Sequence, residues 1–330
     1  MVAQAHPNIA LIKYWGKRDA RLNLPAVGSL SITLSQLETC TRIARHAAAP
    51  DDCVYIDELL LDGAPAETEL RTRLQTLANQ MWRNNGPPPV LAIDTHNNFP
   101  TAAGLASSAS GYAALVTGLD SILDCHYDDS ELSTFARIGS GSAARSLYGG
   151  FVLMDKGLQE DGSDAIARPL LGADEWPLDV VIAVTSTTSK QTSSTDGMER
   201  TRATSPFFPA WCAGQETDLA AASSAVRARD FDQLADLSEY SCLKMHGLMM
   251  AAQPGLLYWN AATLACLHEI RALRNRGVGV FFTVDAGPQV KAICAPGEGD
   301  AVAAILGEID GVITLHRAGL GEGARVVAAR

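Results

Sequence analysis

The chain has 330 residues, of which 47% are hydrophobic and 19% are charged, and its formal net charge at pH 7 is -11. A chain of this length can bury a full hydrophobic core, and we expect it to divide into two domains. The acidic balance argues against a nucleic-acid-binding surface, because the phosphate backbone would be repelled. We therefore expect a globular protein with a small-molecule ligand. An anionic ligand would need a local cluster of cations and backbone N–H groups.

The patterns of residues alternate between strand-like and helix-like along the chain and predict a mixed α and β protein. We place a domain boundary near Pro177, which separates residues 1–178 from residues 179–330. The polar turn 156–164 is typical of a hairpin tip, and 169–177 is expected to be a connection. Strands are predicted at 9–12, 29–34, 39–45, 90–95, 150–154, 180–185, 278–284, 290–294 and 311–316, and helices at 67–84, 219–229, 231–250 and 257–276.

The first predicted strand continues into an unusual exit turn, and residues 8–18 read N-I-A-L-I-K-Y-W-G-K-R. Three cations and a Tyr-Trp pair are rare on a solvated face, because alternate strand residues point to opposite sides and an indole is rarely left in water. We interpret this segment as the wall of a pocket. The alternative is an edge strand with ordinary surface lysines.

Residues 97–111 are rich in small side chains and lead into an apolar helical run that starts at Tyr112. Gly104 to Ser108 would form the first turn of that helix. The unpaired N–H groups and the positive end of the helix dipole attract phosphate there, and the hydroxyls of Ser107 and Ser108 can bind phosphate or Mg²⁺. The alternative is a helix N-terminus packed tightly on a sheet.

A second segment of small and hydroxylated residues, 139–150, also reads as a helix start, with Arg145 on its first turn. The planar guanidinium fork suits phosphate or carboxylate. Ala144 stands where a dinucleotide fingerprint has its third glycine, and a Walker lysine is missing, so neither of those motifs is present.

Asp285 ends an apolar strand and is followed by a Gly-Pro turn. A lone aspartate here is by default a turn residue that accepts backbone hydrogen bonds. Neighbouring cations would keep it ionised, and it would then serve as a base for a hydroxyl proton.

Together these motifs resemble the diphosphomevalonate decarboxylases of the GHMP kinase superfamily, over about residues 8–288. The resemblance implies an α+β fold, with a ribosomal protein S5 domain 2-like N-terminal domain and a ferredoxin-like C-terminal domain that carries the catalytic aspartate. It implies ATP-dependent decarboxylation of mevalonate 5-diphosphate to isopentenyl diphosphate, with the C3 hydroxyl phosphorylated first. ATP is the co-substrate, and Mg²⁺ is bound mainly by its phosphates. A homodimer is implied as well.

The family's site residues carry over by position. Catalytic roles fall on Asp285, Arg145, Lys13 and Ser108; substrate contacts on Asn8, Tyr14, Lys17, Ser140, Ser142 and Ser194; and the ATP phosphate loop on Gly104, Leu105, Ala106, Ser107 and Ser108.

The sequence departs from the family at Val27, where asparagine is common, and at Thr195, where some bacterial relatives have an arginine. Arg200 or Arg202 is a candidate replacement for that arginine. The departures leave open a decarboxylase that acts on the 5-monophosphate. A mevalonate 3-kinase is disfavoured because Asp285 is present, and a non-catalytic nucleotide sensor is the alternative of another class.

Seven scattered cysteines without a C-x-x-C pair are typical of reduced thiols in the cytoplasm. No apolar run approaches the about 20 residues of a membrane span, so a soluble, cytoplasmic protein without a membrane partner is expected. The histidines show no metal-binding spacing, and we expect His246 to have no catalytic role.

Overall fold

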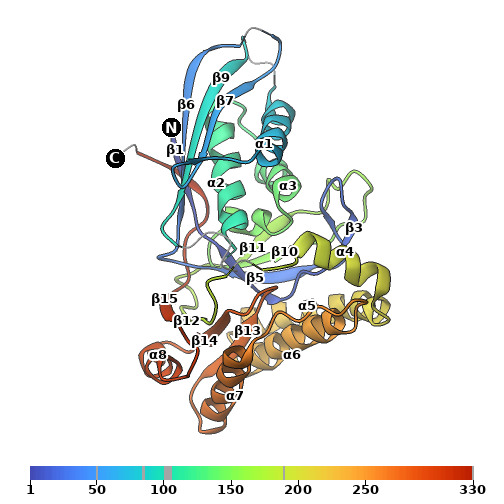
Figure 1. Ribbon diagram of the computed structural model, residues 1–330, viewed down its shortest axis with the longest axis vertical. Helices are drawn as coiled ribbons and strands as arrows, with labels where there is room; N and C mark the ends of the chain where they lie inside the picture. Colours follow the sequence, from blue (N-terminus) through green and yellow to red (C-terminus); the bar gives the residue numbers. More distant parts are fainter. Residues whose placement is uncertain (50, 84–85, 100–105, 189, 329–330) are drawn as a thin grey trace.

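The structure is a computed structural model of the chain, and it describes residues 1–330 except 50, 84–85, 100–105, 189 and 329–330. The described residues form three main sheets with helices packed against them, arranged along an elongated molecule (Figure 1).

The first sheet occupies the upper part of Figure 1 and has the strand order β16-β1-β6-β9-β7-β8. β7 and β9 are parallel, and the other neighbours are antiparallel. The last strand of the chain therefore returns to pair with the first. The bounds are β1 Val2–Ala5, β6 Thr39–Ala48, β7 Tyr55–Leu61, β8 Ala64–Pro65, β9 Pro89–Asn97 and β16 Arg325–Val327.

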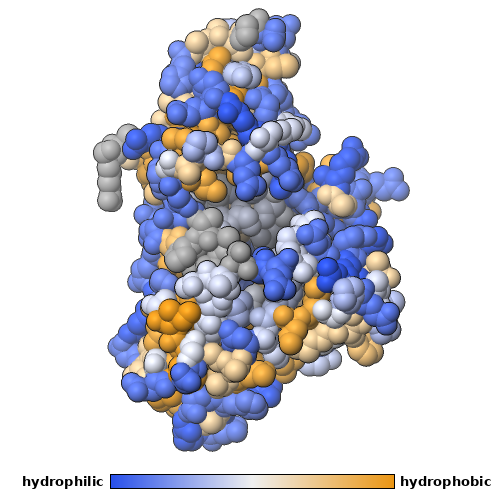
Figure 2. All heavy atoms as spheres, viewed as in Figure 1, coloured by the Kyte–Doolittle hydropathy of each residue, from blue (hydrophilic) through white to orange (hydrophobic). Residues whose placement is uncertain are grey.

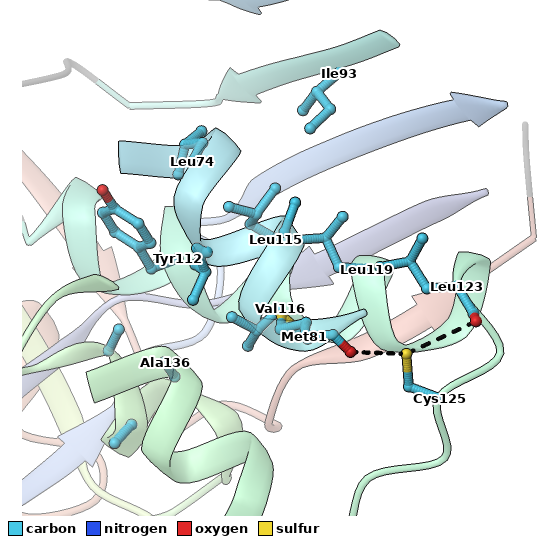
Figure 3. Close-up of a cluster of buried hydrophobic side chains, with 14 of the residues drawn as sticks. Leu74, Met81, Ile93, Tyr112, Leu115, Val116, Leu119, Leu123, Cys125 and Ala136 are labelled. Atoms are coloured by element: carbon cyan, nitrogen blue, oxygen red, sulfur yellow. Dashed lines mark hydrogen bonds between the residues drawn. The ribbon is translucent and has the colours of Figure 1, made fainter. Parts of the chain in front are cut away.

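Three helices, α1 (Thr68–Met81), α2 (Ser107–Ile122) and α3 (Asp129–Gly139), pack together on one face of this sheet (Figure 1). Leucines spaced three or four residues apart put one face of α2 into the apolar cluster of Figure 3. At Gly118 the helix lies so close to β6 that an added Cβ would stand 2.9 Å from Ile43.

The second sheet has the order β11-β10-β5-β2 and is antiparallel throughout. A two-stranded ribbon, β3 with β4, follows β2, and a short 3-10 helix, η1, precedes β10. The bounds are β2 Asn8–Ile12, β3 Lys17–Asp19, β4 Leu24–Pro25, β5 Ser29–Thr33, η1 Ala143–Leu147, β10 Phe151–Met154 and β11 Ala167–Leu171.

The third sheet has the order β13-β14-β12-β15, again with antiparallel neighbours. Helices separate β12 from β13 and β14 from β15, which is the β-α-β-β-α-β arrangement of a ferredoxin-like unit. The bounds are β12 Asp179–Val184, α4 Ser194–Thr204, α5 Phe208–Ala228, α6 Phe231–Met250, α7 Ala261–Asn275, β13 Val280–Val284, β14 Val290–Cys294, α8 Gly299–Gly307 and β15 Thr314–Ala318.

One hydrophobic cluster joins the second and third sheets through α5 and α6, and it includes Ile9, Ile32, Ile182 and Phe281. α6 packs against both β2 and β13, so it holds the ends of these two strands together. The Thr283 hydroxyl also donates a hydrogen bond to the Ala10 carbonyl at 3.2 Å. This junction positions the functional site.

The sequence correctly predicted a mixed α and β fold. The nine predicted strands lie at or close to observed strands, and the predicted hairpin tip at 156–164 connects β10 and β11. The helix predicted at 219–229 is the second half of the longer α5, and 169–171 belongs to β11 instead of a connection. The prediction of a helix start at Gly139 was wrong. Gly139 ends α3, because its extended successor Ser140 breaks the helix, and Arg145 lies on the short η1.

Hydrophilic residues cover much of the face seen in Figure 2, with hydrophobic residues interspersed among them. Within the part of the chain that the structure describes, the helices are too short or too polar to cross a membrane.

We expect Phe281→Ala to lower the free energy of unfolding by about 3 to 5 kcal/mol, because it opens a cavity in the cluster that joins two sheets. The Phe281 ring is fully buried and meets Phe231 edge-on at 5.4 Å between ring centroids. Urea unfolding measures the change, with Leu158→Ala as the control, since Leu158 is 81% exposed. Equal effects of the two substitutions would contradict this assignment of the core.

Candidate active site

A cleft of about 400 Å³ opens between the helices α1 and α2 on one side and strand ends of the second and third sheets on the other. It is lined by the end of β2, the start of α2, the loop into η1, the segment before α4 and the end of β13. The sequence-predicted residues that it brings together are Asn8, Lys13, Tyr14, Lys17, Ala106, Ser108, Ser140, Ser142, Arg145, Ser194 and Asp285. Gly104 and Leu105 lie outside the described residues, and Ser107 lines a neighbouring pocket.

Asp285 follows β13 and stands between two lysines. The Lys13 ammonium is 2.5 Å from its Oδ1, and the Lys291 ammonium is 3.1 Å from its Oδ2. Burial opposes ionisation of Asp285, but the two positive charges outweigh it and hold the pKa of the carboxyl well below its usual range. Asp285 is therefore ionised at neutral pH, as a proton acceptor must be.

Lys291 was missed at the sequence level. It is the second residue of β14, whose five residues are all buried. Burial lowers the pKa of Lys291, and the Asp285 charge opposes this. A lysine inside a short apolar strand is itself a signal, because a buried charge needs a partner. That partner, six residues earlier in the chain, cannot be read from spacing alone.

Arg145 is buried on η1 beneath the cleft. Its Nε donates to the Asn8 Oδ1 at 3.2 Å and its Nη1 to the Ser29 hydroxyl at 2.8 Å, while its guanidinium lies 5.9 Å from the centre of the Tyr14 ring. Burial lowers the pKa of Arg145 to about 10, so it stays charged at neutral pH. Since both bonds go to neutral partners, the charge is available to an anionic ligand.

Three serine hydroxyls connect the two segments of small residues. Ser108 lies 3.5 Å from Ser140, and Ser140 lies 3.4 Å from Ser142, measured between Oγ atoms. Ser108 is in the first turn of α2, which begins after Ala106 in the left-handed conformation (φ 58°) and has no side-chain cap. The prediction placed this helix turn at Gly104 to Ser108, and the described helix begins at Ser107; backbone N–H groups at such a helix start suit an anion.

The opposite end of the cleft is also cationic. Lys17 and Arg73 both line it, and burial together with the Arg73 charge lowers the pKa of Lys17. Arg73, on α1, donates to the Gly139 carbonyl at 2.8 Å and was not predicted. The buried Tyr14 hydroxyl also lines the cleft, and a Cβ at Gly141 would collide with it, so this turn requires glycine.

Arg200 and Arg202 were the predicted replacements for the arginine that some bacterial relatives have at the position of Thr195. Neither is among the described residues that line the cleft. Arg202 pairs with Glu199 on the surface of α4, and Arg200 lines a separate pocket behind α4. Lys190 adds a cation instead, and its ammonium donates to the Ser194 hydroxyl at 2.8 Å.

An apolar pocket of about 200 Å³ adjoins the cleft on the other side of Ser108. It lies between β7, α1 and α2, and leucines dominate its lining. Ser108 and Tyr112 line both spaces. An apolar pocket beside an anion-binding helix end suits a ligand with a flat ring and a phosphate chain.

His246 lies behind Asp285 on α6. Its Nε2 is 3.2 Å from the Val284 carbonyl and 3.2 Å from the Trp259 indole N–H. Burial lowers the pKa of His246 to about 3, so the ring is neutral at neutral pH. It is not among the described residues that line the cleft.

The chain matches two family descriptions and several known proteins. The diphosphomevalonate decarboxylase-like N-terminal domain matches residues 5–167, and the mevalonate 5-diphosphate decarboxylase C-terminal domain matches residues 180–310. A diphosphomevalonate decarboxylase from Aspergillus fumigatus is 41% identical over 300 residues, which are 85% of this chain and 73% of that protein.

Solved structures agree with these matches. The mevalonate diphosphate decarboxylase of Staphylococcus aureus superposes with a TM-score of 0.88 at 32% identity, over 99% of this chain and 97% of that one. MDDEF in complex with MVAPP, AMPPCP and magnesium superposes with a TM-score of 0.87 at 33% identity, over 99% and 98%. The fold, the cleft and these similarities agree, and the chain belongs to the diphosphomevalonate decarboxylase family.

Proposed function

We propose that this cleft is where the chain acts as the ATP-dependent carboxy-lyase of its family, in the mevalonate pathway. The substrate is mevalonate 5-diphosphate and the products are isopentenyl diphosphate, carbon dioxide, phosphate and ADP. The observation that carries the assignment is the ionised Asp285, held between Lys13 and Lys291 in a cleft that also contains Arg145 and Ser108.

In the first step Asp285 accepts the proton of the C3 hydroxyl, whose oxygen attacks the γ-phosphorus of ATP. Lys13 and the first turn of α2, with the Ser108 hydroxyl, stabilise charge on the transferred phosphoryl group. Phosphoryl transfer depends mostly on such positioning and electrostatics. The tertiary hydroxyl is thereby converted into a phosphate ester, a far better leaving group.

In the second step the C3–O bond breaks and phosphate leaves with the bonding electrons. The C1–C2 bond releases carbon dioxide, and its electron pair forms the C2–C3 double bond. Arg145 is placed to bind the C1 carboxylate and the departing phosphate. Its hydrogen bonds to Asn8 and Ser29 hold the guanidinium in position for both.

ATP would occupy the α2 side of the cleft. The apolar pocket between β7, α1 and α2 takes the base, and the exposed N–H groups at the start of α2 take the phosphates. Among the described residues, no three or more His, Cys, Asp or Glu side chains lie together in a group that could hold a metal ion. Mg²⁺ would therefore be held by the ATP phosphates, with the Ser108 hydroxyl as the protein ligand, and it would neutralise phosphate charge.

The 5-diphosphate would bind at the far end, where Lys17, Arg73, the Tyr14 hydroxyl and the serines Ser140 and Ser142 converge. Arg73 and Lys190 supply the positive charge that Thr195 does not. Ser194, which accepts a hydrogen bond from Lys190, would complete the contacts to the substrate.

The division into residues 1–178 and 179–330 is also part of the proposal, as are a cytoplasmic location and a homodimer. The matched family regions, 5–167 and 180–310, support the division. β16 is the exception, since it returns to the first sheet.

Asp285→Asn should lower kcat by at least about 10³-fold and change ATP affinity only a few-fold, since proton transfer matters in the transition state. Carbon dioxide release measures kcat, and calorimetry measures ATP binding. The control is Asp236→Asn, an exposed carboxylate on α6 that pairs with Arg274. If folded Asp285→Asn protein turned over nearly normally, the base would have to be sought elsewhere.

Arg73→Met should lower kcat/KM for the diphosphate about 10- to 100-fold, the value of a charged hydrogen bond, and lower it less for the monophosphate. The unmodified protein should prefer the diphosphate over the monophosphate by more than about 10²-fold. Competition between the two substrates at equal concentration, followed by identification of the product, measures this preference. The matched control is Arg71→Met, on the same helix, because Arg71 donates to the Ile56 carbonyl outside the cleft. A uniform loss for both substrates would remove Arg73 from the diphosphate site.

A further inference from the structure

Each oxygen of the Asp285 carboxylate has its own lysine, and both lysines are buried, but Lys13 lines the cleft whereas Lys291 is not among the described residues that do. Lys13 follows β2 and lines the cleft. Lys291 is in β14, where it pairs with Thr283 of β13 and Ile182 of β12, and it is not among the described cleft-lining residues. Lys291 therefore approaches Asp285 from the sheet, and Lys13 approaches it from the ligand side.

The mechanism gives Lys13 two tasks. It pairs with Asp285 and must also face the transferred phosphoryl oxygens, whose several negative charges compete with one carboxylate. If the phosphoryl charge draws Lys13 away, the Asp285 carboxylate loses part of its electrostatic stabilisation. This happens at the step in which Asp285 must be held in position to accept a proton. Lys291 escapes this competition because it lies outside the cleft.

We propose that Lys291 is a positioning residue that keeps Asp285 oriented and ionised through Oδ2 while Lys13 serves the phosphoryl group. The inference rests on the proposed function. It assigns to the two lysines separate roles: Lys13 follows the ligand, and Lys291 stays with the base.

The surroundings of this pair support a dedicated role. A buried ion pair is weak support for stability, because replacing it with well-packed apolar groups is often neutral or stabilising. The neighbours of Lys291 in β14 are apolar and buried, so an apolar side chain of similar length suits the strand.

Three other groups around Asp285 keep the same charge near neutral pH. On α6, His246 is uncharged because burial lowers its pKa to about 3, and Cys242 is protonated because burial raises its pKa to about 11. Arg145 on η1 stays charged, with a pKa of about 10. Lys190, before α4, is a cation whose pKa burial lowers.

Glu239, also on α6, is another buried carboxyl. Burial raises its pKa, and it pairs with Arg271 at 3.3 Å, so it has a cation of its own and does not share the lysines of Asp285. It serves as the matched control.

The test is Lys291→Met, compared with the unmodified protein, Lys291→Arg and Glu239→Gln. Losing Lys291 raises the pKa of Asp285. Because activity needs the ionised carboxylate, the pH at which activity falls on acidification should rise. We expect the acid limb of kcat to move up by about one pH unit or more. We expect kcat to fall about 10- to 100-fold and both KM values to change only a few-fold. Lys291→Arg should restore part of kcat and return the acid limb toward its original position, whereas Glu239→Gln should leave the limb unmoved.

The inference would be overturned if the acid limb of Lys291→Met did not move and thermal melts showed that its loss of kcat comes from a smaller folded fraction. An equal shift of the limb in Glu239→Gln would overturn it as well. If Lys291→Arg unfolds because the site is too tight, the pH profile of Lys291→Met decides alone. Failure of the proposed function looks different, because the unmodified protein would then release no carbon dioxide from mevalonate 5-diphosphate and ATP.

Discussion

The carboxylate of Asp285 between two buried lysines is the interaction on which the site depends. Among the described residues, the cleft is lined by the Asp285 carboxylate and by five cationic side chains. These cations are Lys13, Lys17, Arg73, Arg145 and Lys190. Lys13 and Arg145 are buried, and taking such charges out of water costs several kcal/mol per ion unless partners compensate, whereas Arg73 and Lys190 are exposed. Among the described lining residues five cations outnumber one carboxylate, which supports the proposal of a polyanionic ligand within a chain of net charge -11.

The fold makes this arrangement possible by joining strand ends from distant parts of the sequence. Lys13 leaves β2 and Asp285 leaves β13, and α6 holds both strands in one apolar cluster. Its Ser241 hydroxyl accepts a hydrogen bond from the Lys13 amide at 2.9 Å, which fixes the backbone where the strand ends. The rigid cluster, and not the loops alone, therefore sets the distance between the base and its cations.

The sequence revealed those site residues whose chemistry is visible in a local pattern. Asp285 at a strand end, Lys13 beside Tyr14 and Trp15, and the small residues before α2 were recognisable in this way. Arg73 was not, because on α1 it looks like an ordinary exposed residue of an amphipathic helix, and only tertiary packing brings it to the Gly139 turn. β1 and the edge strand β16 were missed for a similar reason, since they are short and their pairing joins opposite ends of the chain.

The three serine hydroxyls show how the two ligands would be brought together. Ser108 belongs to the helix end suited to ATP and Ser140 to the turn suited to the acid substrate, and their Oγ atoms are 3.5 Å apart. Two anion-binding turns that are in hydrogen-bond contact leave little space between a bound γ-phosphoryl group and a bound C3 hydroxyl. Because phosphoryl transfer relies on position and charge, with little covalent participation of the protein, this proximity would itself contribute to catalysis in the proposed function. The same proximity would concentrate negative charge from both ligands near Lys13, and this is the physical reason for proposing a separate role for the second lysine behind Asp285.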